Sequence, residues 1–305
     1  MIYSGHADNV FALTFSPDGQ YVASGGRDKA VQVWNPQSGQ TLYTYRGHTN
    51  VVLSVAWSPV ARGQGERDGR FLASGCTDGV VQVWEALSGN TLVTYRGHTR
   101  FVRSVAWSPD GNYIASGGDF GDSTVQVWEA ATGKHIYTHD AQYRIFSLGW
   151  SLDGKCIASA SFDGTVQVWD ALNGAISLTY PGHAGPVYAM AWSPVARGQG
   201  ERDGQYIASG GQDATVQVWG AAQGNTIAVF TGHSGPVKTL AWSPDGKYIA
   251  SAGDDTTVQV WKASTGKSVF MYDHHAERVR AVAWSPNGQT IVSASNEVVH
   301  VWHPF

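Results

Sequence analysis

Serine, histidine and aspartate recur together at regular distances in this 305-residue chain. A serine nucleophile, a histidine base and an aspartate that orients the base are the three parts of a hydrolase triad. Five sets contain all three residues and end on a tryptophan: His6, Ser24, Asp28 and Trp34; His48, Ser74, Asp78 and Trp84; His98, Ser116, Asp122 and Trp128; His183, Ser209, Asp213 and Trp219; His233, Ser251, Asp255 and Trp261. Five copies of one catalytic site would be unusual chemistry, so the spacing must be explained first.

The spacing comes from an internal repeat. The tetrapeptide Val-Gln-Val-Trp begins at Val31, Val81, Val125, Val166, Val216 and Val258, and Val-His-Val-Trp begins at Val299. Two steps are longer because the string "VARGQGER" is inserted identically at residues 60–67 and 195–202. Without it the unit is about 42 residues long and is present seven times. The glycines of the insertion lack the spacing and the following helix of a phosphate-binding loop, so we expect surface loops without chemistry.

Each unit reads as four short β-strands. In the sixth unit the runs "VKTLAW", "KYIASAG", "TTVQVW" and "KSVFMY" are separated by turn-forming residues, and no helical periodicity occurs. This predicts an all-β, seven-bladed β-propeller of four-stranded antiparallel blades. The predicted blades are approximately 7–46, 49–96, 99–138, 142–180, 184–231, 234–272 and 276–304 plus 1–4. Residues 1–4 align with the end of a fourth strand, so we expect the N-terminal strand to close the last blade.

These residues resemble the WD40-repeat family over the whole chain, and the near-identity of the units resembles bacterial WD40 proteins. The resemblance implies that the indole N–H, serine hydroxyl, imidazole and carboxylate of each set hydrogen-bond in series, as a structural network. The fourth unit departs, with Asp140-Ala141 in place of Gly-His, and the seventh has His274 before His275 and Asn296 in the aspartate position. Bacterial members are often fused to kinase or nucleoside-triphosphatase modules, so a regulatory or sensor domain of a larger protein is the alternative function.

The repeat accounts for most residues that could be catalytic. Six of the 11 histidines belong to the repeated positions, and the others (His135, His139, His274, His300 and His303) show no zinc-ligand spacing. Cys76 and Cys156 are interpreted as small apolar residues. We therefore expect no enzyme, no metal and no cofactor. The rival hypothesis, an enzyme or small-molecule binder using the channel, would need acids or nucleophiles outside the repeat.

Function is expected where the units differ. The family most often binds peptides or proteins on the Gly-His face, around the central channel. The candidate binding residues there are Phe101, Arg103, Phe120, Tyr143, Arg144, Phe146, Phe162, Tyr188, Lys238, Arg278 and Arg280. Aromatic residues and arginine are enriched at binding hot spots, although such side chains could instead plug the channel mouth. The basic residues favour an acidic or phosphorylated peptide, whereas a net charge of −4 disfavours nucleic acid.

Composition limits the location. The start "MIYSGH" lacks the features of a signal peptide, and two cysteines do not make a disulfide framework. No apolar run approaches the roughly 18 residues of a membrane span. We expect a cytoplasmic protein that does not enter the membrane, with a protein or peptide partner whose identity the sequence leaves open, as it does the oligomeric state.

Overall fold

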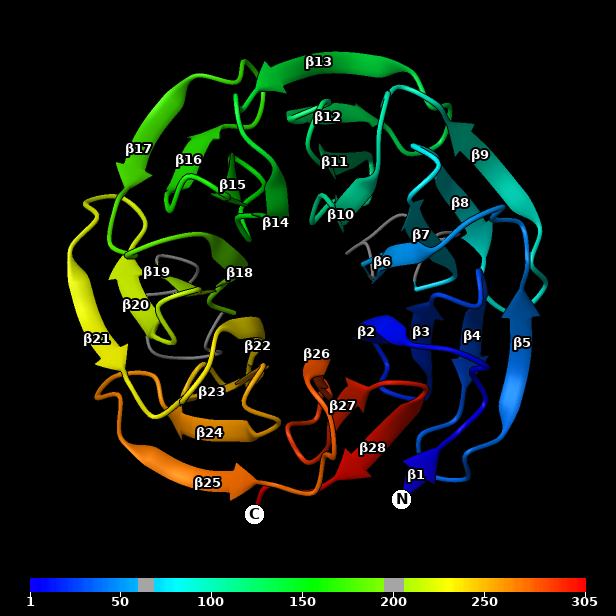
Figure 1. The fold of residues 1–305 in the computed structure, drawn as a ribbon. Helices are drawn as coiled ribbons and strands as arrows, with labels where there is room; N and C mark the ends of the chain where they lie inside the picture. The colour runs from blue at the N-terminus through cyan, green and yellow to red at the C-terminus, as the bar shows by residue number, and fades with distance from the viewer. Residues whose placement is uncertain (60–68, 195–205) are drawn as a thin grey trace.

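A computed structural model describes residues 1–59, 69–194 and 206–305, so the insertions at 60–67 and 195–202 lie outside the described residues. The described residues form seven four-stranded antiparallel sheets, arranged as blades around a common axis (Figure 1). They contain no helix. The all-β, seven-bladed propeller is confirmed.

The strands are best described by their rank in a blade, counted outward from the axis (Figure 1). The first strands are β2 (Val10–Phe15), β6 (Val52–Trp57), β10 (Val102–Trp107), β14 (Ile145–Trp150), β18 (Val187–Trp192), β22 (Val237–Trp242) and β26 (Val279–Trp284). The second strands are β3 (Val22–Gly26), β7 (Phe71–Cys76), β11 (Tyr113–Gly118), β15 (Cys156–Ser161), β19 (Tyr206–Gly211), β23 (Tyr248–Gly253) and β27 (Ile291–Ser295). The third strands are β4 (Val31–Trp34), β8 (Val81–Glu85), β12 (Thr124–Glu129), β16 (Val166–Asp170), β20 (Val216–Gly220), β24 (Val258–Lys262) and β28 (Val298–Trp302). The outermost strands are β5 (Thr41–Tyr45), β9 (Thr91–Tyr95), β13 (His135–Asp140), β17 (Ile176–Tyr180), β21 (Thr226–Phe230), β25 (Ser268–Tyr272) and β1 (Ile2–Tyr3).

The N-terminal strand closes the ring. Strand β1 pairs antiparallel with β28, with Ile2 opposite His300 and Tyr3 opposite Val299. The backbone of Met1 donates to Val301 O at 2.9 Å and accepts from Val301 N at 2.8 Å. The last blade is therefore built from both ends of the chain, as the alignment of residues 1–4 predicted, and it has no unpaired third strand.

Turns between the first and second strands follow from their sequence. In the first blade Ser16 Oγ donates to Asp18 at 2.6 Å and accepts from the backbone N–H of Tyr21 at 2.9 Å. Gly19 has a φ of 73°, a left-handed conformation that a side chain disfavours. The string Ser-Pro-Asp-Gly thus specifies a tight turn by side-chain hydrogen bonds and one glycine.

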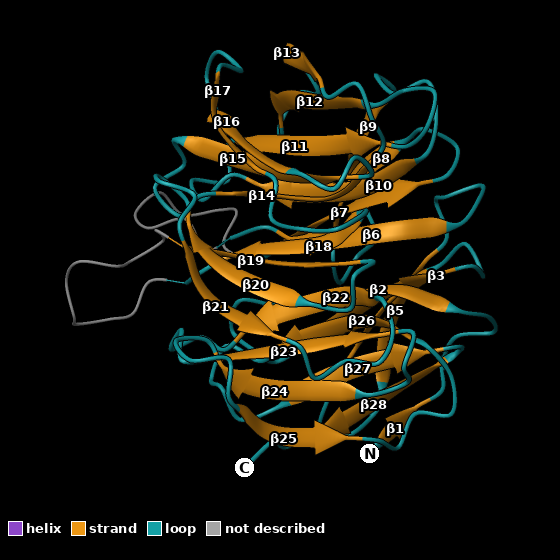
Figure 2. Ribbon diagram, turned by 60° about the vertical axis from the view of Figure 1, so that its left-hand side comes forward, coloured by secondary structure: helices purple, strands orange, loops and turns teal. Residues whose placement is uncertain are grey.

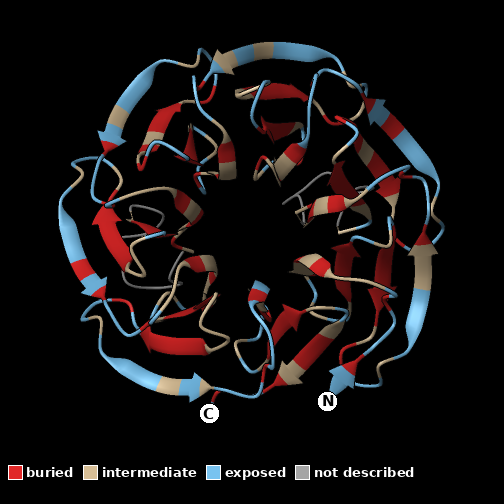
Figure 3. Ribbon diagram, in the orientation of Figure 1, coloured by how far each residue is buried: buried red, intermediate tan, exposed pale blue. Residues whose placement is uncertain are grey.

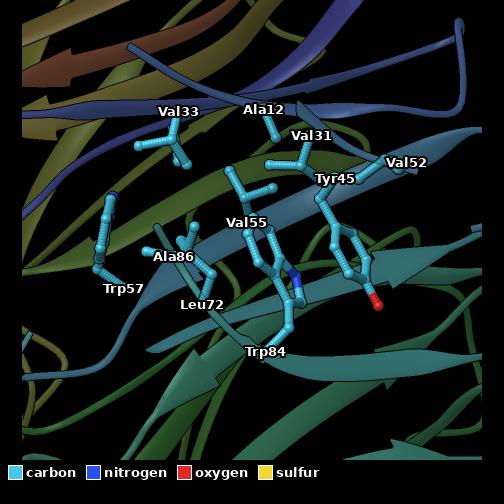
Figure 4. Close-up of a cluster of buried hydrophobic side chains, with 11 residues drawn as sticks. Ala12, Val31, Val33, Tyr45, Val52, Val55, Trp57, Leu72, Trp84 and Ala86 are labelled. Carbon is cyan, nitrogen blue, oxygen red and sulfur yellow. The ribbon is translucent and has the colours of Figure 1, made fainter. Parts of the chain in front are cut away.

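The hydrophobic core lies between neighbouring blades. One cluster joins Val31 and Tyr45 of the first blade to Val55, Leu72 and Trp84 of the second (Figure 4). Tyr45, on an outermost strand, stacks on Trp84 of the next blade with ring centroids 4.2 Å apart. Second and third strands are largely buried while outermost strands are largely exposed (Figure 3). Because each core cluster is shared, each blade depends on its neighbours for stability.

The loops gather on two opposite sides of the ring (Figure 2). One side contains the segments that precede the first strands and the turns that join the second and third strands. We call this side the Gly-His face. It positions both the repeated histidines and the residues that differ between blades.

Candidate functional site

Repeated side chains form a buried hydrogen-bond series at the Gly-His face of four blades. In the first blade His6 Nδ1 lies 2.9 Å from Asp28, His6 Nε2 lies 2.7 Å from Ser24 Oγ, and Trp34 Nε1 donates to Ser24 Oγ at 3.1 Å. The other three series are His98, Asp122, Ser116 and Trp128; His183, Asp213, Ser209 and Trp219; His233, Asp255, Ser251 and Trp261.

These series have the connectivity of a hydrolase triad but not its accessibility. Ser24 has no exposed surface, and its hydroxyl oxygen accepts the indole N–H of Trp34. A nucleophile must reach a substrate carbonyl carbon, and this hydroxyl faces only its own blade. Burial alone would raise the pKa of Asp28, but the hydrogen bond and charge of His6, together with backbone hydrogen bonds from Ala7 and Ala30, lower it. The carboxylate stays ionised and holds the imidazole.

The glycine before each histidine has a steric reason. A Cβ at Gly47 would collide with the hydroxyl of Tyr45 and with the side-chain oxygen of Gln82. Those two groups hydrogen-bond each other, and Gln82 also donates to Gly47 O at 3.0 Å. The Gly-His pair is thus fixed by the tyrosine–glutamine contact beneath it.

The last blade departs from this pattern in a coordinated way. His300 replaces the glutamine, accepts or donates a 2.9 Å hydrogen bond with Tyr272 Oη, and stacks on His275 with centroids 4.2 Å apart. His274 replaces the glycine and is exposed. His275 Nε2 lies 2.7 Å from Ser293 Oγ, and its Nδ1 lies 2.8 Å from Ser295 Oγ instead of an aspartate. The network is closed here by a different residue, which the sequence comparison with Asn296 did not predict.

The fourth blade lacks the network. Ala141 is buried against Ile145 and Trp169, and Trp169 Nε1 has no hydrogen-bond partner among the described residues. His139 stacks on the Trp169 ring at 4.8 Å, where the other blades use tyrosine or phenylalanine. Within the described residues, the Asp163 carboxylate accepts hydrogen bonds from Thr165 alone, from its side chain at 2.8 Å and its backbone N–H at 2.9 Å.

The residues that differ between blades converge beside this fourth blade. Arg103 Nε and Arg144 Nε lie 2.6 Å and 2.7 Å from the two oxygens of Asp119. The Arg144 guanidinium lies over the rings of Phe120, Phe146 and Phe162 at 5.8, 5.8 and 5.5 Å, and that of Arg103 lies 5.4 Å from the Phe146 centroid. We call these six residues the rim cluster. One buried carboxylate holds both guanidinium groups, and these in turn lie against the aromatic rings.

A second group continues from the rim cluster. Tyr188 packs edge-on against Phe146 at 4.9 Å, and Lys238 Nζ lies 3.4 Å from the Tyr188 centroid. Lys238 and Arg278 both approach Asp254, at 3.7 Å and 3.9 Å. Burial lowers the pKa of Lys238, and the charge of Asp254 opposes this.

Not every predicted residue joins these groups. Arg280 instead lies over Phe11 at 5.2 Å, on the first blade. Phe101 and Tyr143 are 44% and 49% exposed, and no ring contact to either is found among the described residues. They flank the rim cluster in sequence as exposed aromatic side chains.

Asp119 was missed by the sequence analysis. It is only 4% exposed, and its carboxylate is shared by two arginines. The sequence does contain a signal that could have identified it. The third unit has two extra residues before its turn aspartate, Asp122, and Asp119 lies in this extension, where the repeat requires no acidic residue. Asp119 also makes the rim less basic than the sequence indicated, because it offsets one of the two arginine charges.

The family comparison agrees with this architecture. A family model described as "WD domain, G-beta repeat" matches residues 1–35, 39–62, 66–85, 89–129, 133–170, 201–220, 224–262 and 266–303. The chain belongs to the WD40 family. Among the described residues of this WD40 protein, no helix is long and apolar enough to cross a membrane.

Individual relatives match over short segments. The chain is 44% identical over 63 residues to the transcriptional repressor rco-1 of Neurospora crassa, which is 21% of this chain and 10% of that protein. It is 43% identical over 54 residues to the U3 small nucleolar RNA-interacting protein 2 of Mus musculus, covering 18% of this chain and 11% of that protein. It is 38% identical over 60 residues to the peroxisomal targeting signal 2 receptor of Homo sapiens, covering 19% of each. The chain thus spans about a tenth to a fifth of these relatives.

Proposed function

We propose that this WD40 protein is a non-catalytic interaction scaffold that binds a protein or peptide ligand at the rim cluster. The observation that carries the proposal is an exposed aromatic surface organised around paired arginines. Phe120 and Phe162 are 76% and 50% exposed although they lie against Arg144. Exposed aromatic groups beside arginine are the composition of binding hot spots. The names of relatives, a targeting-signal receptor among them, support a binding role for this fold.

The electrostatics favour an acidic or phosphorylated segment. Arg103 and Arg144 share Asp119, so the three side chains keep one net positive charge. Arg278 and Arg280 add exposed positive charge across the same face. A phosphate or carboxylate group can accept hydrogen bonds from guanidinium groups while an adjacent apolar side chain packs on the phenylalanines. Nucleic acid fits less well, because the chain has a net charge of −4. A cytoplasmic location belongs to the same proposal.

The test uses fluorescent peptide pools with a central phosphothreonine, and the same pools without the phosphate. We expect the protein to bind the acidic or phosphorylated pool, with affinity falling as salt rises. Arg144→Ala and Phe120→Ala should each weaken binding about tenfold or more. Leu172→Ala is the matched control, because Leu172 is 82% exposed and follows a third strand, away from the Gly-His face. Equal binding by all three variants would refute the rim cluster as the site.

A further inference from the structure

The second blade breaks the hydrogen-bond series at one atom. His48 Nε2 lies 2.6 Å from Ser74 Oγ, and Trp84 Nε1 donates to the same oxygen at 3.0 Å. His48 is only 5% exposed, and its Nδ1 has no hydrogen-bond partner among the described residues. In the first, third, fifth and sixth blades this nitrogen faces the turn aspartate. A buried imidazole nitrogen without a partner needs an explanation.

A cysteine thiol and a carboxylate lie near the His48 imidazole. Cys76 is fully buried at the end of β7, and one donor atom from each of His48, Cys76 and Asp78 lies within 4.8 Å of the other two. Asp78 is exposed and accepts a hydrogen bond from the Thr49 hydroxyl at 2.7 Å. The cluster therefore combines one nitrogen, one sulfur and one carboxylate oxygen, and it is open to solvent at the carboxylate.

The last blade shows that a side chain at the position of Cys76 can reach the imidazole, although most of the corresponding residues have no side chain. Four of them are glycines, namely Gly26, Gly118, Gly211 and Gly253. In the last blade the position is Ser295, and its hydroxyl oxygen lies 2.8 Å from His275 Nδ1. Cys76 occupies the same place in the second blade, with a sulfur atom that is larger and softer than the hydroxyl oxygen of Ser295. By analogy with Ser295, the thiol of Cys76 is expected on the Nδ1 side of the His48 ring, within the 4.8 Å that encloses the three donor groups.

We propose that His48 Nδ1, Cys76 Sγ and a carboxylate oxygen of Asp78 form a binding site for a borderline-soft divalent cation of the Zn²⁺ type. Zn²⁺ accepts nitrogen, sulfur and oxygen ligands in tetrahedral geometry, whereas Mg²⁺ and Ca²⁺ prefer oxygen alone. Three protein ligands leave the fourth position to water. In such a site donor atoms lie about 3.5 Å apart, so the donors must approach by about 1 Å from the 4.8 Å limit. Asp78 can supply this movement because it is exposed on a turn.

The proton positions are consistent with coordination. Coordination at Nδ1 requires the imidazole proton on Nε2, where Ser74 Oγ can accept it as it accepts the Trp84 N–H. Nδ1 then presents its lone pair to the cation. On binding, the Cys76 thiol releases its proton to solvent and a sulfur–metal bond forms. The sequence analysis expected no metal and interpreted Cys76 as a small apolar residue, because no second cysteine or histidine lies at ligand spacing. The histidine lies in the segment between β5 and β6, far in sequence from Cys76 and Asp78.

The experiment is a titration of the reduced, chelator-treated full chain with Co²⁺, followed by displacement with Zn²⁺. We expect one Co²⁺ per chain, a thiolate-to-cobalt charge-transfer band, and loss of that band when Zn²⁺ is added. Cys76→Gly should abolish the band and weaken Zn²⁺ binding by about 100-fold or more, since even groups behind the ligands are worth about 10–100-fold. Glycine is native in four blades, so this variant should fold. Asp78→Asn should weaken binding while keeping the band.

Cys156→Ala is the matched control, and it should bind Co²⁺ and Zn²⁺ like the parent chain. Mg²⁺ should not displace Co²⁺. Binding without a thiolate band, or equal Zn²⁺ affinity in the Cys76→Gly variant, would overturn the proposal and point to the other histidines. Absence of any Co²⁺ or Zn²⁺ binding would also overturn it, leaving the thiol as a hydrogen-bond donor to Asp78.

Discussion

A single serine in each complete blade satisfies two buried groups. In the first blade Ser24 accepts the Trp34 N–H and bonds to His6, and none of the three side chains is exposed beyond 4%. Removing the hydroxyl leaves a buried indole N–H and a buried imidazole nitrogen without partners. Each unsatisfied group costs about 1–3 kcal/mol, more than the hydrogen bond itself contributes. The contribution of the serine to stability therefore depends on how many neighbouring groups its removal would leave without a hydrogen bond.

The fourth blade provides the control for this argument. We expect Ser24→Ala to lower the free energy of unfolding by about 2 kcal/mol or more. Ser159→Ala should cost less than about 1 kcal/mol, because within the described part of the chain Trp169 Nε1 already lacks a partner and Ala141 stands where the other blades have the imidazole. Denaturant unfolding of both variants measures the difference. Equal losses would show that the hydroxyl acts through packing and not through the network.

Buried histidines make the last blade sensitive to acid. Burial, reinforced by His300 and His274, lowers the pKa of His275 to about 3 from its ordinary 6.5. Between these values the unfolded chain binds a proton that the folded chain refuses, so stability falls as pH drops from 6.5 towards 3. His48, whose pKa burial lowers to about 4, contributes in the same direction.

Substitution of the neighbouring histidine tests this pH dependence. We expect the free energy of unfolding to decrease on acidification through that window, with a shallower slope in His300→Gln. Glutamine is the residue at this position in the other blades, and it removes both one buried titrating group and a positive neighbour of His275. Unfolding measured at several pH values compares the slopes. An unchanged slope in the variant would mean that His300 does not contribute.

At the scale of elements, the seam of the ring is its shortest pairing. Strand β1 has two residues, whereas β9, at the same rank, has five. Its side chains partly compensate for this. Tyr3 stacks on Trp34 with centroids 4.1 Å apart, and it hydrogen-bonds Gln32 and, at 2.8 Å, Thr41. One tyrosine thus attaches the terminal strand to the first blade as well as closing the last.

The seam should open before any other blade. We expect backbone amides of β28 to exchange hydrogen faster than those of β8 in the second blade. The outer neighbour of β28 is the two-residue β1, whereas that of β8 is the five-residue β9. Tyr3→Ala should increase this difference, while Tyr95→Ala, at the equivalent place on β9, should loosen the third blade locally and leave the seam unchanged. Hydrogen exchange followed by mass spectrometry resolves the strands. Equal protection of β28 and β8 would contradict a weak seam.

At the scale of the whole molecule, the repeat explains why the architecture was predictable and the site was not. Strand order, blade number and closure by residues 1–4 follow from a sequence pattern that is repeated seven times. Where the strand boundaries of one unit are ambiguous, the other units define them. Five of the six rim-cluster residues were among the candidates chosen from positions that break the pattern. Asp119 was not, because its role is a contact between Arg103 on β10 and Arg144 beside β14, which no local pattern encodes. The thiol of Cys76 was missed for the same reason.

The two insertions test how independent the ring is of its loops. Trp57 pairs with Leu72 and Trp192 with Ile207, as Trp107 pairs with Ile114 in a blade without an insertion. The backbone bond of Ser58 N to Phe71 O, 2.8 Å, likewise matches that of Ser108 N to Tyr113 O, 2.9 Å. The strands on either side are therefore already set for a short turn, and deleting 60–67 and 195–202 would leave Ser-Pro-Asp-Gly at both places.

We expect the double deletion to fold, to keep binding at the rim cluster, and to gain stability. Each shortening reduces the closed segment from 14 residues to 6, which lowers the entropy cost of closure by about 0.8 kcal/mol. Thermal unfolding and the phosphopeptide titration measure the two effects, with each single deletion as the control for additivity. The insertions belong to the second and fifth blades, whereas the rim cluster belongs to the third and fourth. Their removal should therefore not alter peptide affinity. If the double deletion alone lost peptide binding or dissociated an oligomer, the prediction would be wrong. That result would indicate a partner that contacts the insertions of both blades.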